Sequence, residues 1–330
     1  MRGTSSAAAV APTRQLVGCR VAGRSYAFDG NDVRFIVRTD QVVAGGGGIA
    51  CVGTLKGPDP VPVFSVAALL HPSADADGGA HVIVTGGVSR VGWQVERILR
   101  GGRDDAHEVL PLPALAGPVA RRWFAGLLTQ GDDEPSLLCS PSGLDPRARA
   151  CLALPDPTPP KIALSSSGTA RGVVALFSSP ALPRCVAQRY AISGRRIVAV
   201  AQSLAGRVVP GTPSYIVAFA AWRGIAVPLL DLSGRTSTAV DGSSGRYLLV
   251  RHGTGAQATV VGLAIDRDVV LHQASHADTP LASPGSVVPP GIRLFRVKEE
   301  PIAFLDLDVL MGLRVASALG DPAGAAAAHW

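Results

Sequence analysis

The residues from 222 to 232 read Trp222-Arg223-Gly224-Ile225-Ala226-Val227-Pro228-Leu229-Leu230-Asp231-Leu232. A glycine followed by a short apolar run that ends at Asp is typical of a tight turn leading into a buried β-strand. Similar runs bounded by Gly, Pro, Ser or Asp predict strands at 173–177, 195–201, 225–232, 247–251, 259–265, 294–297 and 302–307. Seven such strands in about 140 residues predict compact barrels, because closing a sheet removes its exposed edges.

The composition agrees with a mainly β fold. The chain has 330 residues, which fits one large or two ordinary domains, and 47% of them are apolar while 17% are charged, so wholesale disorder is excluded. Its 38 glycines and 26 prolines disfavour long helices. We expect few helices, of which the clearest spans 309–319, begins at Asp308 and stops at Gly320.

An internal repeat divides the chain. Tyr26-Ala27-Phe28 corresponds to Tyr190-Ala191-Ile192 at an offset of 164 (190 − 26), and residues 61–64 correspond to 227–230 at an offset of 166 (227 − 61). Four further anchors follow in the same order: Lys56-Gly57 with Arg223-Gly224, residues 82–84 with 248–250, Val91-Gly92 with Val261-Gly262, and Glu134-Pro135 with Glu300-Pro301. Ordered anchors with a nearly constant offset predict a duplicated domain with loop insertions.

The repeat and the composition together predict the domain limits. We expect a disordered tail at 1–14, a first domain at 15–144, a linker at 145–172, a second domain at 173–319 and a flexible tail at 320–330. The linker contains a proline-rich stretch and a serine-rich stretch, which predict an extended part and a flexible part.

The second copy resembles the CheW-like domain of bacterial chemotaxis coupling proteins. The resemblance rests on linked motifs in the family's order: Val208-Val209-Pro210-Gly211-Thr212-Pro213, Arg223-Gly224, Val227-Pro228-Leu229-Leu230-Asp231-Leu232, Val261-Gly262 and Phe304-Leu305-Asp306-Leu307-Asp308. It implies two small five-stranded β-barrels per copy, and a non-enzymatic adaptor that joins chemoreceptor cytoplasmic tips to a CheA-type histidine kinase. Such adaptors use barrel surfaces and the groove between barrels, and they need no cofactor.

The first copy departs from this pattern. Lys56 stands where the family has Arg, Pro58-Asp59-Pro60 lengthens the turn, and a tetraglycine at 45–48 stands in place of the VPGxP segment. Ser65 occupies the position of Asp231, and Ser140 occupies the position of Asp306. These departures predict that the first copy keeps the fold but acts as a dimerisation or spacer half.

Arg223 is the residue that we expect to contact a partner, together with Gly224 and Trp222. Arginine presents a planar, permanently charged fork that suits an interface carboxylate, and glycine lets the chain turn sharply beside it. The alternatives are an ordinary solvated hairpin arginine and a core tryptophan. Lys56 and Gly57 are the degenerate counterparts in the first copy.

Neighbouring residues of the same motifs are expected to shape the fold. Asp231 suits acceptance of backbone N–H groups in the turn that follows it. Pro228 predicts an edge position or a bulge, and Gly262 predicts a close approach of two backbones.

Other chemistries find little support in the sequence. His272 and His276 are four residues apart, but prolines follow and no third metal ligand is evident. The glycine-rich loop lacks the Lys-Ser/Thr of a phosphate loop, and no GxSxG elbow occurs, so we expect no catalytic residue, metal or cofactor. Five cysteines without a CxxC pair predict buried thiols in a reducing cytosol.

Net charge and hydropathy limit the classes of partner that the sequence favours. The formal charge of +6 is spread along the chain and aromatic residues make up 5%, so nucleic acid is not favoured. No apolar run reaches the roughly 20 residues of a membrane helix. We expect a cytoplasmic protein, associated with a membrane only through receptor arrays. Two alternatives stay open: an adaptor in a pilus-motility or other chemosensory-like pathway, and a small-barrel protein that binds nucleic acid or another ligand.

Overall fold

The computed structural model describes fifteen segments of the chain, and all structural statements concern these residues. They are 15–45, 50–72, 79–86, 90–99, 102–103, 107–129, 135–149, 172–182, 189–233, 245–253, 258–266, 268–274, 279–280, 291–297 and 300–312. The tails, most of the expected linker, Glu134 and His276 lie outside them.

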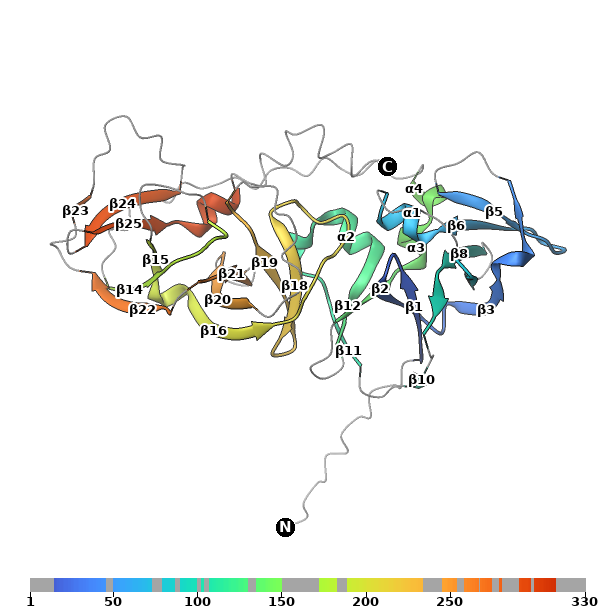
Figure 1. Cartoon of the computed structure of the whole chain (residues 1–330), viewed down its shortest axis with the longest axis horizontal. Coiled ribbons are helices and arrows are strands. Elements are labelled where there is room, and N and C mark those ends of the chain that lie inside the picture. The colour runs from blue at the N-terminus through green and yellow to red at the C-terminus, as the bar shows by residue number, and fades with distance from the viewer. Residues whose placement is uncertain are drawn as a thin grey trace, which may run out of the picture. The chain divides into compact units, whose positions relative to one another are not determined.

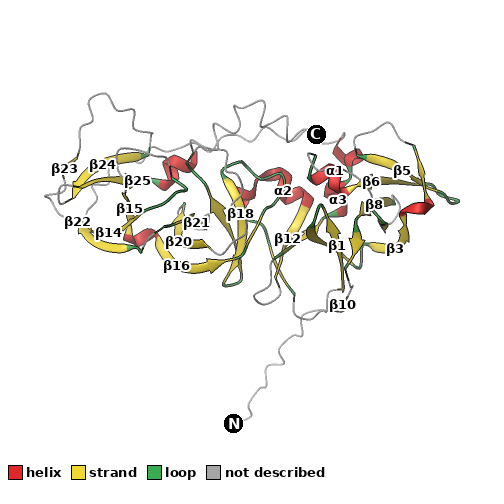
Figure 2. Cartoon of the chain, viewed as in Figure 1, coloured by secondary structure: helices red, strands yellow, loops and turns green. Residues whose placement is uncertain are grey.

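Strands dominate the described residues, and the helices among them are short (Figure 2). The elements of the first copy are β1 (Gln15–Val21), β2 (Arg24–Asp29), β3 (Val33–Arg38), η1 (Thr39–Gln41), β4 (Val42–Ala44), β5 (Cys51–Leu55), β6 (Val61–Ser65), α1 (Val66–Leu70), β7 (His81–Thr85), β8 (Val91–Val95), β9 (Arg97–Ile98), β10 (Gly102–Arg103), β11 (Glu108–Leu110), η2 (Ala114–Ala116), α2 (Gly117–Trp123), β12 (Phe124–Thr129), β13 (Ser136–Cys139), α3 (Pro141–Leu144) and α4 (Pro146–Arg149).

The second copy repeats this series of strands. Its elements are β14 (Gly172–Phe177), β15 (Arg189–Ser193), η3 (Gly194–Arg196), β16 (Ile197–Leu204), β17 (Gly206–Arg207), β18 (Ile216–Trp222), β19 (Ile225–Leu230), β20 (Gly245–His252), β21 (Thr259–Ala264), β22 (Val270–Ala274), β23 (Thr279–Pro280), β24 (Ile292–Val297) and β25 (Glu300–Leu305). Residues 307–312 form a final helical turn.

The sheet topology is the same in the two copies. In the first copy the strand orders are β10-β1-β2-β13-β12-β11 and β3-β7-β8-β6-β5-β4; in the second they are β22-β14-β15-β25-β24-β23 and β16-β20-β21-β19-β18-β17 (Figure 1). Each strand of the second series occupies the place of its counterpart in the first. The predicted mainly β class, with two sheets in each copy and few short helices, is confirmed.

Strand counts differ from the expected five. Each sheet has six strands along its path, and β9 adds a seventh in the first copy by pairing with β1. Short terminal strands account for the difference: β10, β17 and β23 have two residues each, and β4 and β11 have three. Segments this short give no periodicity that a sequence pattern can register.

The repeat anchors occupy equivalent registers. Tyr26 lies opposite Leu137 in the parallel pair of β2 and β13, and Tyr190 lies opposite Ala303 in the parallel pair of β15 and β25. Both copies also break register at the start of the edge strand, between Val33 and Phe35 in β3 and between Ile197 and Ala199 in β16. A bulge at the same place in both copies supports the duplication.

One anchor was shifted by a residue. Val84 lies opposite Gly92, and Leu249 lies opposite Gly262, so residues 82–84 correspond to 247–249 rather than 248–250. Both segments are uniformly apolar, so their sequences do not distinguish the two alignments. In a strand such a slip exchanges the two faces, and only the cross-strand partners fix it.

Two further expectations need correction in their boundaries. The strand expected at 195–201 begins at Ile197, because Gly194–Arg196 forms a 3-10 turn before it. The final helix begins at 307, and Asp306 caps it: Asp306 Oδ1 accepts a hydrogen bond from the Val309 amide at 3.4 Å. Asp308, the expected first residue, lies inside the helix and faces other partners.

The chain divides into two compact units. One comprises Met1–Glu108 with Ser136–Pro146, and the other comprises Val109–Pro135 with Arg147–Trp330. The second unit therefore contains a segment from the first half of the chain. The predicted domain limits of 15–144 and 173–319 stay a prediction.

A buried tryptophan lies at the centre of the first copy's core. Trp93 is fully buried and stacks on Phe28, with ring centroids 6.5 Å apart. Its indole Nε1 donates a hydrogen bond of 2.7 Å to the Thr85 hydroxyl, which is also buried. The apolar body and the polar N–H of the ring are thus both satisfied without water.

Replacing Thr85 by Val should destabilise the first copy. The change keeps the side-chain shape but leaves the buried indole N–H of Trp93 without an acceptor, which costs about 1–3 kcal/mol. Urea unfolding followed by tryptophan fluorescence measures the difference. Thr85→Ser retains the hydroxyl and should lose clearly less; equal losses in both variants would contradict the role of this hydrogen bond.

Candidate partner-binding surface

The hairpin of β18 and β19 ends in the predicted partner-binding residues. The two strands pair as far as Trp222 opposite Ile225, and Arg223-Gly224 forms the two-residue turn between them. Both turn residues have positive φ, 48° at Arg223 and 73° at Gly224. Two consecutive left-handed residues define a type I′ turn, whose twist matches that of the flanking strands.

Arginine at a left-handed position costs roughly 1 kcal/mol that glycine would avoid. The Trp222 ring contacts the side chain of this arginine: the Arg223 guanidinium carbon lies 4.9 Å from the centroid of the ring. Trp222 is half-buried and packs against the core cluster of this sheet, whereas Arg223 and Ile225 are exposed. We call Trp222, Arg223, Gly224 and Ile225 the hairpin tip.

The structure thus brings the three predicted residues together in one rigid turn. Trp222 packs against the core cluster of its sheet, and the Arg223 guanidinium lies over its ring. A cation over an indole face gains about 0.5–1 kcal/mol at an exposed site, so the guanidinium is pre-positioned outside the sheet.

The first copy has a different tip. Its last strand pair is Leu55 opposite Val61, and the five residues 56–60 between them are unpaired and exposed. Lys56 and Gly57 therefore lie on a wide loop, and the lengthened turn is confirmed. Pro58 and Pro60 lack the N–H that a continued ladder would need, which explains why the strands separate early.

Of the three residues expected to shape the fold, Asp231 and Gly262 agree with the expectation and Pro228 does not. Asp231 Oδ1 accepts a hydrogen bond from the Ser233 amide at 2.9 Å. A Cβ at Gly262 would lie 2.7 Å from Leu229 Cδ2, so the parallel strands approach closely here and a larger residue would displace the Leu229 side chain. The expectation for Pro228, an edge position or a bulge, is wrong: Pro228 lies opposite Phe219 in β19, an inner strand between β18 and β21, and the register shift of this pair lies elsewhere, between Ile216 and Ala218.

A second surface feature lies where β14 and β22 approach the start of β16. It is an open depression of about 650 Å³. Its lining residues are Val173, Ser193, Gly194, Arg195, Ile197, Leu271 and Gln273. We call this feature the η3 depression, because η3 connects its two sides.

The η3 depression combines exposed apolar side chains with polar groups and one positive charge. Leu271 is 66% exposed and Val173 is 46% exposed, which is unusual for large apolar side chains on neighbouring strands of one sheet. Arg195 is the single charged residue among its lining residues. The combination fits an apolar partner segment that carries a carboxylate.

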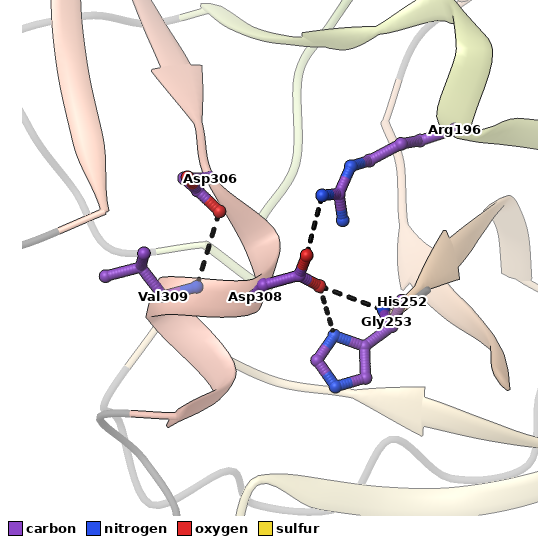
Figure 3. Close-up of polar contacts among 6 residues, drawn as sticks. All are labelled: Arg196, His252, Gly253, Asp306, Asp308 and Val309. Atoms are coloured by element: carbon purple, nitrogen blue, oxygen red, sulfur yellow. Dashed lines mark hydrogen bonds and ion pairs between the residues drawn. The ribbon is translucent and has the colours of Figure 1, made fainter. Parts of the chain in front are cut away.

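A polar cluster connects the final helix to the second sheet of the copy. Asp308 Oδ2 accepts a hydrogen bond of 2.6 Å from Arg196 Nη2, and its Oδ1 lies 2.8 Å from His252 Nδ1 (Figure 3). The Gly253 amide donates to the same Oδ1 at 3.0 Å. The Asp308 carboxylate thus connects the segment after β25 to Arg196, directly before β16, and to His252 and Gly253 at the end of β20.

These contacts change the acidity of Asp308. The contact with the His252 imidazole, then the Arg196 guanidinium and the Gly253 amide, hold the pKa of this carboxyl well below its usual range, although partial burial acts in the opposite direction. The hydrogen bond with Asp308 also raises the pKa of Arg196. The carboxylate is therefore ionised at neutral pH and stabilises both neighbours.

An imidazole beside a carboxylate occurs in hydrolytic sites, but here the same carboxylate also binds an arginine. The arrangement fits a structural clasp between two sheets better than an acid–base pair. The sequence pattern placed Asp308 at a helix start and gave no sign of its contact with His252. The first copy has Asp32 and Ser142 at the positions of Arg196 and Asp308, so the clasp belongs to the second copy.

The remaining sequence candidates are placed as follows. His272 lies in strand β22, so the helical spacing considered for it and His276 does not apply. Among the described residues, no three His, Cys, Asp or Glu side chains gather as a metal site would need. Burial raises the thiol pKa of Cys19 and of Cys139, which keeps both protonated. Within the described part of the chain, no helix has the length and apolarity to cross a bilayer.

Fold and topology together define a mainly β protein built from two copies of one strand order. No family model and no curated protein matches the chain. Among solved structures, the scaffolding protein TtCheW from Thermoanaerobacter tengcongensis is similar to part of it, with 13% identity and a TM-score of 0.33 over 39% of this chain and 89% of that one.

Replacing Asp308 by Asn should remove an acid-sensitive part of the stability. Because the folded-state pKa is depressed, the contribution is complete above the unfolded pKa near 3.9 and is lost as pH falls below it. We expect D308N to cost about 1–2 kcal/mol at pH 7, a value discounted for partial exposure, and to flatten the pH dependence below about pH 4.

Urea unfolding at several pH values measures this effect. Asp268→Asn is the matched control, because Asp268 pairs with Arg246 at 2.6 Å but its side chain is 82% exposed. An Asp308 variant whose acid profile matches that of the Asp268 variant would refute the clasp.

Proposed function

We propose that this chain is a tandem scaffold protein of the CheW-like class, which couples chemoreceptor cytoplasmic tips to a CheA-type histidine kinase. The sequence motifs of the second copy support this proposal, and so does the identical strand order of the two copies. The proposal places the protein in the cytoplasm, associated with membranes only through receptor arrays, and assigns it no reaction of its own.

The hairpin tip is the observation that carries the proposal. A type I′ turn fixes the backbone, the Trp222 ring supports the guanidinium of Arg223, and Ile225 adds an exposed apolar side chain at 41% exposure. A binding group that is already ordered loses little conformational entropy when a partner binds. In this role Arg223 provides register and specificity, while apolar burial provides most of the affinity.

The η3 depression supports a second contact on the same copy. Residues of both sheets line it, and in this proposal it serves as the groove that such adaptors are expected to use. In this proposal Val173 and Leu271 contact apolar side chains of the partner, and Arg195 pairs with one of its carboxylates. The first copy, whose tip has opened into a five-residue loop, serves as a spacer or dimerisation half in this proposal.

Charge reversal at Arg223 tests the tip. We expect Arg223→Glu to reduce capture of a CheA-type kinase or a receptor fragment at least tenfold, because it removes the guanidinium and repels a partner carboxylate. The melting temperature should change little, since Arg223 is exposed and glutamate meets the same backbone strain. The matched control is Lys56→Glu at the tip of the first copy, which should bind normally; normal binding by R223E would sink the assignment.

Leu271→Asp tests the η3 depression separately. Leu271 is 66% exposed, so the folded state should tolerate aspartate within about 0.5 kcal/mol. We expect receptor capture to fall at least tenfold, because a carboxylate would then occupy the apolar face. Gln273→Asp, on the same strand and in the same lining, adds the charge without removing apolar surface and should lose less. Equal receptor binding by L271D and the unaltered chain would remove the depression from the proposal.

A further inference from the structure

Helix α2 lies in a compact unit with the second copy, although it comes from the first half of the sequence. Pro118 near its start and two arginines, Arg121 and Arg122, in its last turn favour a short helix at this place. One face of α2 buries Ala120 and Trp123, and the opposite side exposes Arg121.

That buried face meets the loop that precedes β18. A Cβ at Gly211 would lie 2.7 Å from Val119 Cγ1 and 3.2 Å from Trp123 Cζ3. At the other end of the contact, a Cβ at Gly117 would lie 3.4 Å from Pro213 Cδ. A Cβ at Gly211 would thus clash with Val119, whereas a Cβ at Gly117 would be in ordinary van der Waals contact with Pro213.

Hydrogen bonds within the segment fix the conformation of the loop at this contact. The Thr212 hydroxyl donates to the Val209 carbonyl at 2.9 Å, and the Ile216 amide donates to the Pro213 carbonyl at 2.9 Å. Val209 is 2% exposed, and Gly211 adopts a φ of 77°. The first copy has four consecutive glycines, 45–48, at the equivalent place in the sequence, so only the second copy carries this proline-containing loop.

We propose that the loop of residues 209–213 is a docking site for a short apolar helix, and that α2 is its resident occupant. While α2 is in place, the loop is closed to helices of other proteins, so α2 acts as an autoinhibitory element. The helix that fits has apolar side chains four residues apart, as Val119 and Trp123 are. This inference does not depend on the proposed coupling of receptor and kinase.

A double-mutant cycle in the full chain tests the contact. Gly211→Ala adds the Cβ that meets Val119 Cγ1, and Val119→Ala removes that atom. The backbone strain of alanine at a φ of 77° is the same in both backgrounds and cancels in the cycle. We expect G211A to raise hydrogen exchange of the α2 amides about tenfold when Val119 is retained and less than about threefold in the V119A background.

Gly224→Ala is the control for backbone strain. It introduces alanine at a φ of 73° in the hairpin tip, and it should leave α2 exchange unchanged in both backgrounds. An equal effect of G211A in the two backgrounds would mean that the helix and the loop are not coupled, which overturns the proposal.

A labelled peptide of residues 113–126 tests whether α2 closes the loop. Val119→Glu should release the helix, so the peptide should bind V119E at least tenfold more tightly than the unaltered chain. Arg121→Glu, on the exposed side of the same helix, should behave like the unaltered chain. Equal binding to all three proteins, or no binding to V119E, would overturn the docking site.

Discussion

Four parallel strand pairs constrain this chain more than any other interaction. In each copy a parallel pair joins the second strand to a strand near the end of the copy, β2 with β13 and β15 with β25, and another joins β6 with β8 or β19 with β21. Every other strand pair with a described register is antiparallel. Parallel neighbours cannot be joined by a tight turn, so the intervening chain must build other structure before it returns. The second sheet of each copy is the structure built in that interval.

The two copies differ where the chain leaves the sheets rather than within them. Inside the sheets, Gly92 and Gly262 occupy the same place beside a parallel neighbour, with Val63 and Leu229 opposite them. At the ends, a supported arginine in the second copy is replaced by a wide loop, and an ion cluster around Asp308 has no counterpart residues in the first copy. The two copies therefore share one framework and differ in the groups that they present at the ends of the strands.

Sequence patterns predicted the strands, the repeat and the hairpin tip, because each rests on residues close together in the chain. Turn residues identify Arg223-Gly224 directly, and apolar runs bounded by glycine identify β19 and β21. The η3 depression and the cluster around Asp308 were missed because they join residues that are far apart, such as Arg196 and Asp308. The repeat alignment paired residues 82–84 with 248–250 instead of 247–249 for a related reason. The sequence of a uniformly apolar strand does not show which of its residues faces which neighbour.

The parallel closure of each copy also bears on synthesis of the protein. Tyr26 finds its parallel partner only at Leu137, and Tyr190 only at Ala303, so each copy remains an open sheet until more than a hundred further residues have left the ribosome. Such non-local closure slows folding and leaves edges exposed during translation. The second sheet of each copy, β3 to β8 or β16 to β21, is continuous in sequence and can form first. Both sheets can thus be complete before the returning strand, β13 or β25, pairs with β2 or β15.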